Sequence, residues 1–345
     1  MSAYRLNVAI VGCGYVAHHH AKAWRKIPRT RILAVYDTDV ERARLFSRQW
    51  SIPNIYLSFE DLLRDERISV IDICTPPQTH LDLVIRAIKE RKHVLVEKPL
   101  TMTVKEAHEI LRQKPPDIRI GVVYNLLFEP IILKLISIVR RGDIGQIYNI
   151  RVDMLHTNQD PMLANEKHWC HRLPGGRFGE VLPHPIYLVG HFLGNDLEVK
   201  NVEAYKLGPY PWVRYDELHV LLGSQGKLGR IYVSFNSPRE AIYITIIGDK
   251  GILETEVITG TIMRLKHLHA PTRYDKGKEV IKQVYQLSSS LIINAARVAS
   301  HRWITGHEGY IRAFAESLTS GKELPNTIEK VLKDVEILEK ICKKL

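Results

Sequence analysis

The segment Asn7–His20, NVAIVGCGYVAHHH, decides the fold of the first part of this chain. It opens with a short apolar run of the kind that becomes a strand buried on both faces of a parallel sheet. Gly12, Gly14 and Ala17 follow at once, in the spacing G-x-G-x-x-A. In such a strand-to-helix turn the first glycine permits the tight turn, the second lets backbone approach a pyrophosphate, and the third small residue lets the helix pack on the strand.

The residues after this loop indicate which cofactor it would hold. A helix that begins at Tyr15 and Val16 offers backbone N–H groups to a pyrophosphate. Asp37 ends the next apolar run, 32–36, and lies 23 residues after Gly14. This is close to the spacing of about 20 for a carboxylate that binds ribose hydroxyls. No Arg follows Asp37 directly, so the pattern predicts NAD rather than NADP.

The length of 345 residues is enough for two domains with separate cores. A hydrophobic fraction of 45% and a charged fraction of 25% are typical of a globular protein. No segment approaches the roughly 20 apolar residues of a membrane span. The first strand follows Met1 closely, so we expect no signal peptide. The cysteines form no C-x-x-C pair, and we expect a reducing cytoplasm. They are Cys13, Cys74, Cys170 and Cys342.

The formal net charge is +11, which would attract anionic ligands such as a dinucleotide or an anionic sugar derivative. It would attract nucleic acid too. However, Lys and Arg are spread along the chain rather than gathered in one arm or on one helix face, so we expect no nucleic-acid partner.

Strands and helices alternate up to residue 125, which predicts a doubly wound parallel (Rossmann) sheet of α/β class in residues 1–125. Ligands of such sheets bind beyond the carboxyl ends of the strands. Thr75 and Pro76, with His80 close behind, follow one predicted strand. Glu97 and Lys98 lie at the end of the next, and Asn125 lies beyond a fifth.

From residue 126 the pattern changes to one helix and then six long strand-like runs, joined by hairpin-like turns with no helices between them, before two closing helices. This predicts an α+β domain over 126–345, with a largely antiparallel, open-faced sheet built as a meander. The stretch 168–192 between the first two runs is rich in Gly, Pro, Trp and His, which is typical of a functional loop.

The quoted motifs resemble those of the Gfo/Idh/MocA family (glucose–fructose oxidoreductase and inositol dehydrogenase). The resemblance covers nearly the whole chain, through GCGYVAHHH, then CTPPQTH (74–80), HVLVEKPLT (93–101) and a Gly-Gly loop. The Glu-Lys-Pro motif at 97–99 is the most specific part. The resemblance implies an oxidoreductase that acts on a hydroxyl or keto group of a sugar, cyclitol or sugar nucleotide with NAD, and it implies that Lys98 is catalytic.

A second family motif, similar to G-G-G-x-L-x-D-x-G-x-H, aligns its histidine with His184 and its aspartate with Glu180. The chain departs from this pattern at Pro174 and Pro183, and at Tyr187, where a second Asp is common. We infer a retained active site with an altered substrate pocket. The resemblance also implies that Trp169 and Arg172 lie near the nicotinamide or the substrate. Asn125, at the carboxyl end of a predicted strand, is expected to bind the substrate.

The chemistry of alcohol oxidation fits these residues. A base must accept the hydroxyl proton while hydride leaves carbon, and histidine has a suitable pKa. A lysine ammonium can stabilise the developing alkoxide. Glu180 could orient His184 or share its proton. Two alternatives remain: a glycosidase that recycles tightly held NAD, and an inactive ligand sensor with the same fold.

We predict no metal site. Near Cys170, two histidines offer no tetrahedral set with standard spacing. The run His18–His20 lies on a helix, where three successive side chains cannot point at one ion, so helix packing and solvent contact are expected.

The segment Glu279–Ser300 has apolar residues at helical spacing, and we expect a helix at a subunit interface of a homo-oligomer, a dimer or tetramer. Packing in the core is nearly as well supported. Association with a membrane surface, helped by Lys282, Arg297 and Arg302, is a third possibility.

Overall fold

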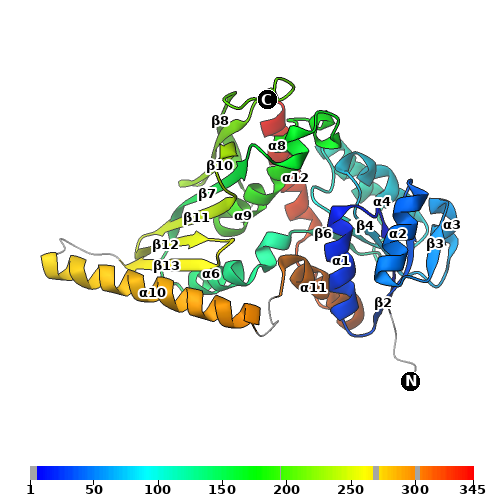
Figure 1. Ribbon diagram of the computed structural model, residues 1–345, viewed down its shortest axis with the longest axis horizontal. Coiled ribbons are helices and arrows are strands. Elements are labelled where there is room, and N and C mark those ends of the chain that lie inside the picture. Colours follow the sequence, from blue (N-terminus) through cyan, green and yellow to red (C-terminus); the bar gives the residue numbers. More distant parts are fainter. Residues whose placement is uncertain (1–5, 195, 267–271, 300–303) are drawn as a thin grey trace. The chain divides into compact units, whose positions relative to one another are not determined.

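The computed structural model describes residues 6–194, 196–266, 272–299 and 304–345. The chain divides into two compact units, each with its own sheet (Figure 1). The described part of the first unit comprises 6–125 and 306–336, and that of the second comprises the described residues of 126–305 together with 337–345.

The sheet of the first unit has six parallel strands in the order β3-β2-β1-β4-β5-β6. The expected doubly wound parallel sheet is therefore confirmed. The strands are β1 (Leu6–Val11), β2 (Thr30–Tyr36), β3 (Asn54–Tyr56), β4 (Val70–Ile73), β5 (His93–Glu97) and β6 (Ile120–Val123). The sequence analysis missed β3, because three residues are too short to show a period.

Helices cover this sheet and begin at recognisable caps. Thr103 and Glu106 form a complete capping box, and Ser58 accepts a hydrogen bond from the backbone N–H of Asp61. The helices are α1 (Tyr15–Lys26), α2 (Val40–Trp50), α3 (Phe59–Arg64), η1 (Pro77–Thr79), α4 (His80–Lys89), α5 (Val104–Gln113), α11 (Gly306–Ser320) and the first part of α12 (Ile328–Cys342).

Helix α11 packs beside α1 and against β6 (Figure 1). Its Phe314 occupies the space that a side chain on Gly121 would need, since a Cβ there would lie 2.6 Å from the ring. Lys26 and Glu308 form an ion pair of 2.6 Å between the two helices. The sequence analysis assigned residues 306–336 to the domain 126–345, whereas they group here with the first unit. Contacts between segments so far apart in the sequence leave no local pattern from which this grouping could be predicted.

The sheet of the second unit has seven strands in the order β13-β12-β11-β7-β10-β9-β8. They are β7 (Ile147–Thr157), β8 (Glu198–Tyr205), β9 (Glu217–Ser224), β10 (Lys227–Ser237), β11 (Ala241–Gly248), β12 (Gly251–Glu256) and β13 (Thr261–Lys266). The sheet is largely antiparallel, as expected. The expected meander is wrong, however, because β7 inserts between β11 and β10 and runs parallel to β10.

The expected loop over 168–192 is largely helical. The second unit contains α6 (Pro130–Arg140), α7 (Pro161–Ala164), η3 (Trp169–Arg172), α8 (Arg177–Val181), α9 (Pro183–Leu193) and α10 (Arg273–Ala299), and η2 (Asn125–Phe128) begins at its boundary. Pro183 and Pro185 occupy the first turn of α9, where a missing N–H costs no hydrogen bond. Helix α9 packs on β7 and β10. Among the described helices, none has the length and apolar character needed to cross a bilayer.

Asp334 on α12 supports a pH prediction. It is buried, it accepts a 2.8 Å hydrogen bond from the Tyr124 hydroxyl, and burial raises its pKa from 3.8 to about 6. Because the folded-state pKa is raised, this group's contribution to stability is complete below about pH 4 and is lost as the pH rises through about 6. Asp334→Asn keeps the acceptor and removes the charge. We expect it to raise the free energy of unfolding by roughly 1–2 kcal/mol near neutral pH and by almost nothing near pH 4.

Urea unfolding at several pH values would measure this difference. Glu329→Gln, at an exposed position on the same helix, is the control and should show no such trend. A gain that does not depend on pH would show that the charge of Asp334 is not the cause.

Candidate active site

The glycine loop between β1 and α1 lets the backbone pass close to its neighbours and to a ligand. Gly12 has a φ of +88°, and a Cβ there would lie 2.7 Å from the Thr75 side chain, so glycine is needed. A Cβ on Gly14 would meet no described atom within 4 Å. Helix α1 has no side-chain cap and no acidic residue in its first turn, where Tyr15 and Val16 lie. This helix end therefore has the features of an anion site, and the donor set fits a pyrophosphate.

Asp37 lies directly after β2 and faces this loop. Its carboxylate accepts hydrogen bonds of 2.8 Å from the backbone N–H groups of Cys13 and Asp39. The Arg42 guanidinium lies 3.6 Å from Asp37 and 3.2 Å from Asp39. The carboxylate is thus held at the end of β2, in the position from which such a group binds ribose hydroxyls.

The loop after β4 is braced by side chains. The hydroxyls of Thr75 and Thr79 lie 2.6 Å apart, and Thr79 also donates to the Pro76 carbonyl. His80 was expected to bind the cofactor, but it is fully buried, and its two ring nitrogens lie 2.9 Å from the carbonyls of Thr75 and Pro99. Burial lowers its pKa, against the effect of these two carbonyls. His80 therefore ties the loops after β4 and β5 together.

Lys98 follows β5 directly and is buried, as is its neighbour Glu97. The backbone N–H of Lys98 donates to the Glu97 carboxylate at 3.2 Å, and the Lys98–Pro99 peptide is cis. The Glu97 carboxylate, which was expected to lie at the cofactor, also lies 2.9 Å from Nε2 of His20. A buried lysine at the carboxyl end of a central strand is placed where parallel sheets bind ligands.

His20, which the sequence analysis assigned to helix packing or solvent, is the centre of a buried polar chain. Its Nδ1 lies 2.9 Å from Asp72, whose carboxylate also accepts from the Trp24 indole at 2.7 Å. Burial opposes the charged imidazolium, but Asp72 raises the pKa of His20 well above its usual value. Burial likewise opposes the charge of Glu97, yet the hydrogen bond from His20 lowers its pKa to about 2. His20 is therefore a cation between two carboxylates.

His307 of α11 completes this chain, at 3.7 Å from Glu97 and stacked on His19. Burial lowers the pKa of His307 to about 4, so it is neutral. Among the described residues, two groups have possible ligand atoms within 4.8 Å of one another: His20, Glu97 and His307, and His20, Asp72 and Cys74. Both nitrogens of His20 already form direct hydrogen bonds, so the geometry is explained without an ion.

In the second unit, His184 lies in the first turn of α9 and is half-buried. Its Nδ1 lies 2.8 Å from the hydroxyl of Tyr187, which accepts a hydrogen bond of 3.1 Å from the backbone N–H of Leu126. Tyr187, fully buried, stands where the family pattern has an Asp. The Tyr187 hydroxyl can accept from Nδ1–H of His184 or donate to Nδ1, depending on the imidazole tautomer. In the first case Nε2 is the basic nitrogen.

Glu180 was expected to orient His184, but the partner that the structure gives its carboxylate is Arg177. Arg177 is buried, also pairs with Asp160 at 2.7 Å, and lies over the Phe235 ring. The Tyr187 hydroxyl lies at Nδ1 of His184, and the expectation that Glu180 orients His184 or shares its proton stays a prediction. No signal in the sequence marked Arg177 or Tyr187 for these roles.

The remaining expected substrate residues lie on short 3₁₀ turns. Trp169 and Arg172 begin and end η3, which buries Cys170 between them. Asn125 begins η2, directly beyond β6. None of these positions identifies a substrate by itself.

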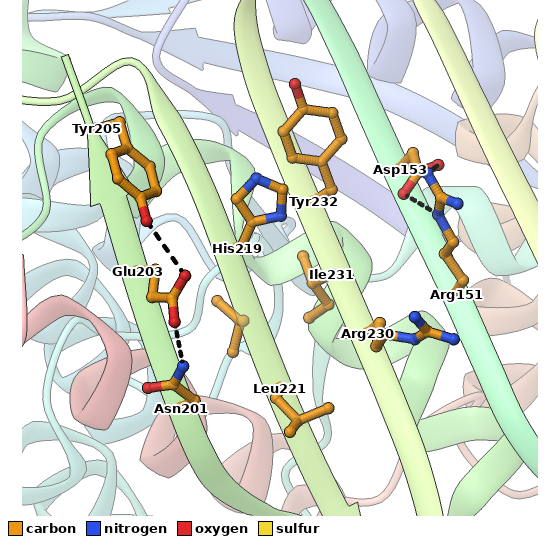
Figure 2. A pocket seen from close by; sticks show the side chains of 11 residues that line it. Arg151, Asp153, Asn201, Glu203, Tyr205, His219, Leu221, Arg230, Ile231 and Tyr232 are labelled. Atoms are coloured by element: carbon orange, nitrogen blue, oxygen red, sulfur yellow. Dashed lines mark hydrogen bonds and ion pairs between the residues drawn. The ribbon is translucent and has the colours of Figure 1, made fainter.

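A depression of about 550 Å³ lies on the exposed face of the second unit's sheet (Figure 2), and His184 is not among the residues that line it. Its side chains largely satisfy one another. Arg151 and Asp153 pair at 2.7 Å, and the rings of His219 and Tyr232 stack at 4.5 Å. The first pair lies within β7, and the second joins neighbouring strands β9 and β10, as side-chain pairs that stabilise sheets do. We assign neither pair a part in the reaction.

The buried chain around His20 supports a prediction for His20→Gln. Two buried carboxylates would lose their cation, so we expect a loss of about 3–5 kcal/mol in the free energy of unfolding near neutral pH. In the wild type the lowered pKa of Glu97 contributes stability that persists until the pH falls through about 2. Without His20, burial would raise the pKa of Glu97. The deficit should then shrink as the pH falls toward about 4.

His18→Gln is the matched control, since His18 bonds only to the Trp50 indole at 2.9 Å among the contacts described for it. Chemical unfolding at several pH values would compare the two variants. An equal, pH-independent loss in both would contradict the charge assignment of His20.

Comparisons with known proteins agree with this geometry. Residues 6–114 match the model of an oxidoreductase family with an NAD-binding Rossmann fold, and residues 136–344 match that of the family's C-terminal alpha/beta domain. The chain is 26% identical over 264 residues to Oxidoreductase P35 of Formosa agariphila, covering 75% of this chain and 81% of the relative. It is 24% identical over 270 residues to the myo-inositol 2-dehydrogenase of Thermotoga maritima, covering 75% and 78%.

Solved structures share the fold. The WlbA dehydrogenase of Bordetella pertussis, in complex with NADH and UDP-GlcNAcA, has a TM-score of 0.81 at 17% identity and covers 100% of this chain and 97% of its own. The 3-ketoreductase KijD10 of Actinomadura kijaniata, in complex with NADP, has a TM-score of 0.77 at 17% identity and covers 98% and 97%. Because both family models match and together span most of the sequence, the chain belongs to the Gfo/Idh/MocA family of oxidoreductases, with an NAD-binding Rossmann domain.

Proposed function

We propose that this enzyme oxidises or reduces one hydroxyl or keto group of a sugar, a cyclitol or a sugar nucleotide, with NAD as its cofactor. In this proposal residues 1–125 bind the dinucleotide and residues 126–345 supply the substrate-binding and oligomerisation surfaces. The observation that carries it is the buried Lys98 at the end of β5, in the same unit as the glycine loop. Relatives named for myo-inositol and levoglucosan oxidation support the substrate class.

The proposed cofactor fits the residues present. The N-terminus of α1, beyond Gly12 and Gly14, would hold the pyrophosphate, and Asp37 would accept from the ribose hydroxyls. When bound, the nicotinamide accepts or donates the hydride. The carboxylate of Asp37 would repel the extra phosphate of NADP, which supports NAD.

Lys98 has the chemistry to stabilise charge on the reacting oxygen. An ammonium group in a site shielded from water lowers the energy of a developing alkoxide more than it would in solution. Glu97 receives the Lys98 backbone N–H and is held in turn by His20. We propose that this bracing keeps Lys98 at one position throughout the reaction.

His184 would accept the hydroxyl proton at Nε2 in oxidation and return it in reduction. Its Nδ1–H would donate to the Tyr187 hydroxyl, which is itself anchored by the Leu126 N–H. We assign Tyr187 as a positioning residue that fixes the tautomer of His184.

We also propose a homo-oligomer, a dimer or tetramer, located in the cytoplasm. The open face of the sheet carries exposed aromatic side chains such as Tyr148, Tyr205 and Tyr243, which supports a protein interface there. The four cysteines are unpaired and buried, as in proteins of reducing compartments.

The cofactor assignment predicts that NAD binds more tightly than NADP. Asp37→Ser removes the repulsive carboxylate and should lower the ratio of NAD to NADP affinity by roughly 100-fold. Fluorescence titration of both cofactors would measure it, with Glu41→Gln at an exposed position of α2 as the control. Tighter binding of NADP by the wild type would overturn the assignment.

The catalytic assignment predicts that Lys98→Ala and His184→Ala lower the rate of hydride transfer by about 10²- to 10⁴-fold. Each removes an interaction that is stronger in the transition state than in the ground state, so substrate affinity should change much less. Tyr187→Phe should lower the rate less and shift its pH profile, because the tautomer of His184 is no longer fixed. Single-turnover formation of NADH, with a panel of myo-inositol, free aldoses and UDP-linked sugars, would measure these rates.

His219→Ala, in the depression of Figure 2, is the control and should leave the rate unchanged. Near-wild-type transfer by His184→Ala would make that residue structural. Turnover without released NADH would favour the NAD-recycling glycosidase. Binding of a sugar with no turnover in any variant or in the wild type would favour the ligand sensor.

A further inference from the structure

Helix α10 lies along β13, the edge strand of the second unit's sheet (Figure 1). Its contacts with that edge are polar. The Gln286 side chain accepts from the backbone N–H of Arg264 at 2.9 Å and donates to the same residue's carbonyl at 3.3 Å. Asn294 donates to the carbonyls of Thr259 and Gly260, each at 2.9 Å. The side of α10 that faces the protein is thus its hydrogen-bonding side.

The opposite side of α10 is apolar and exposed. Ile281, Tyr285 and Ile292 are 72%, 73% and 69% exposed, whereas Ser290, on the protein-facing side, is only 5% exposed. Further exposed members of the same stripe are Tyr274, Val280, Val284 and Leu291. At 3.6 residues per turn these side chains form one continuous face along the helix. Ordinary amphipathic packing is therefore reversed in α10.

This geometry excludes one of the three expectations for Glu279–Ser300. Packing in the core is wrong, because Val280, Val284 and Leu291 are exposed. Ser300 and Arg302 lie outside the described residues, as does the side chain of Arg297. A second copy of the chain and a membrane surface remain as occupants of the apolar stripe.

The charges beside the stripe have one sign. By helical spacing, Lys278 and Lys282 border it on one side and Lys276 on the other. Asp275 caps the helix by accepting from the Thr272 N–H at 3.0 Å, and Glu279 lies on the protein-facing half, where its carboxylate is 3.5 Å from the Lys282 ammonium. The whole chain adds a net charge of +11. The stripe is therefore an apolar face with a cationic border.

We propose that α10 binds the surface of a bilayer that contains anionic lipids, lying in the plane of the interface with its apolar stripe inserted at the headgroup level. An anionic surface complements the border of Lys276, Lys278 and Lys282, and tyrosine rings such as those of Tyr274 and Tyr285 are favoured at that depth. A second copy of α10 would bring the two lysine borders together, and among the described residues Glu279 offsets only Lys282, with which it pairs at 3.5 Å.

Co-sedimentation of the full chain with large unilamellar vesicles tests this proposal. One set contains phosphatidylcholine alone, and the other contains equal parts of phosphatidylcholine and phosphatidylglycerol. The wild type should bind the second set and bind it more weakly as salt rises. The triple variant Ile281→Gln, Tyr285→Gln, Ile292→Gln keeps good helix formers at exposed positions and should lower the partition by at least about 100-fold.

Two further variants separate the contribution of the lysine charges from that of exposed apolar side chains in general. Lys276→Glu with Lys278→Glu should weaken binding to anionic vesicles by about tenfold or more, because it reverses two charges on the border. Leu207→Gln, at an equally exposed apolar position of the second unit, is the matched control and should bind like the wild type. Circular dichroism and hydride transfer in solution, unchanged in all variants, would show that each is folded.

Light scattering of the wild type and the triple variant tests the other occupant, and we expect the same oligomeric state for both. If neither vesicle set is bound and the triple variant falls to a smaller oligomer, the stripe is an interface with a second copy and the proposal is overturned. It is equally overturned if vesicles are not bound and the oligomer is unchanged. Equal binding to both vesicle sets would contradict the requirement for anionic lipid.

Discussion

The first unit depends on one buried cation, the His20 imidazolium, held between the carboxylates of Asp72 and Glu97 at 2.9 Å each. An isolated buried charge costs several kcal/mol, so none of the three groups would be stable there in charged form without the others. They come from α1, β4 and β5, and the network therefore fixes the helix after the glycine loop against the strand ends. Since Glu97 directly precedes Lys98, the same network fixes the position of the Lys98 backbone.

The second unit also contains a buried cation that is neutralised by two carboxylates, but from different residues. Arg177 is a buried cation between two carboxylates, those of Asp160 and Glu180, and it also packs over the Phe235 ring. These contacts join the loop before α7, helix α8 and strand β10. Helix α9, which carries His184, starts directly after α8. In both units a buried cation between two carboxylates holds the element next to a proposed catalytic residue. This role does not require the charged groups to contact the substrate.

The parts of the molecule that were predictable from the sequence are those with local causes. Gly12, the spacing to Asp37 and the alternation of strands with helices each follow from a turn, a period or a fixed offset, and the parallel sheet agrees with them. The errors concern causes that are not local. The insertion of β7 beside β10 joins strands separated by about 80 residues, and the helical character of 168–192 was hidden because its glycines and prolines suit both a loop and the first turn of a helix. The partner of His184 was missed because a tyrosine stands where an acidic residue was expected.

Helices α1 and α10 show which part of a helical pattern can be read from the sequence. Successive residues of a helix differ by about 100° in direction, so His18, His19 and His20 were rightly expected to diverge. The three histidines contact Trp50, His307 and Asp72, respectively. Helical periodicity predicts the directions of the side chains but not these partners. In α10 the periodicity gave the apolar stripe but not the side that meets the protein. The edge of β13 presents unpaired backbone N–H and C=O groups, which apolar side chains cannot satisfy and the amides of Gln286 and Asn294 can. A helix that covers a sheet edge in this way must turn its apolar face outward, and that requirement follows from the edge it covers rather than from its own sequence.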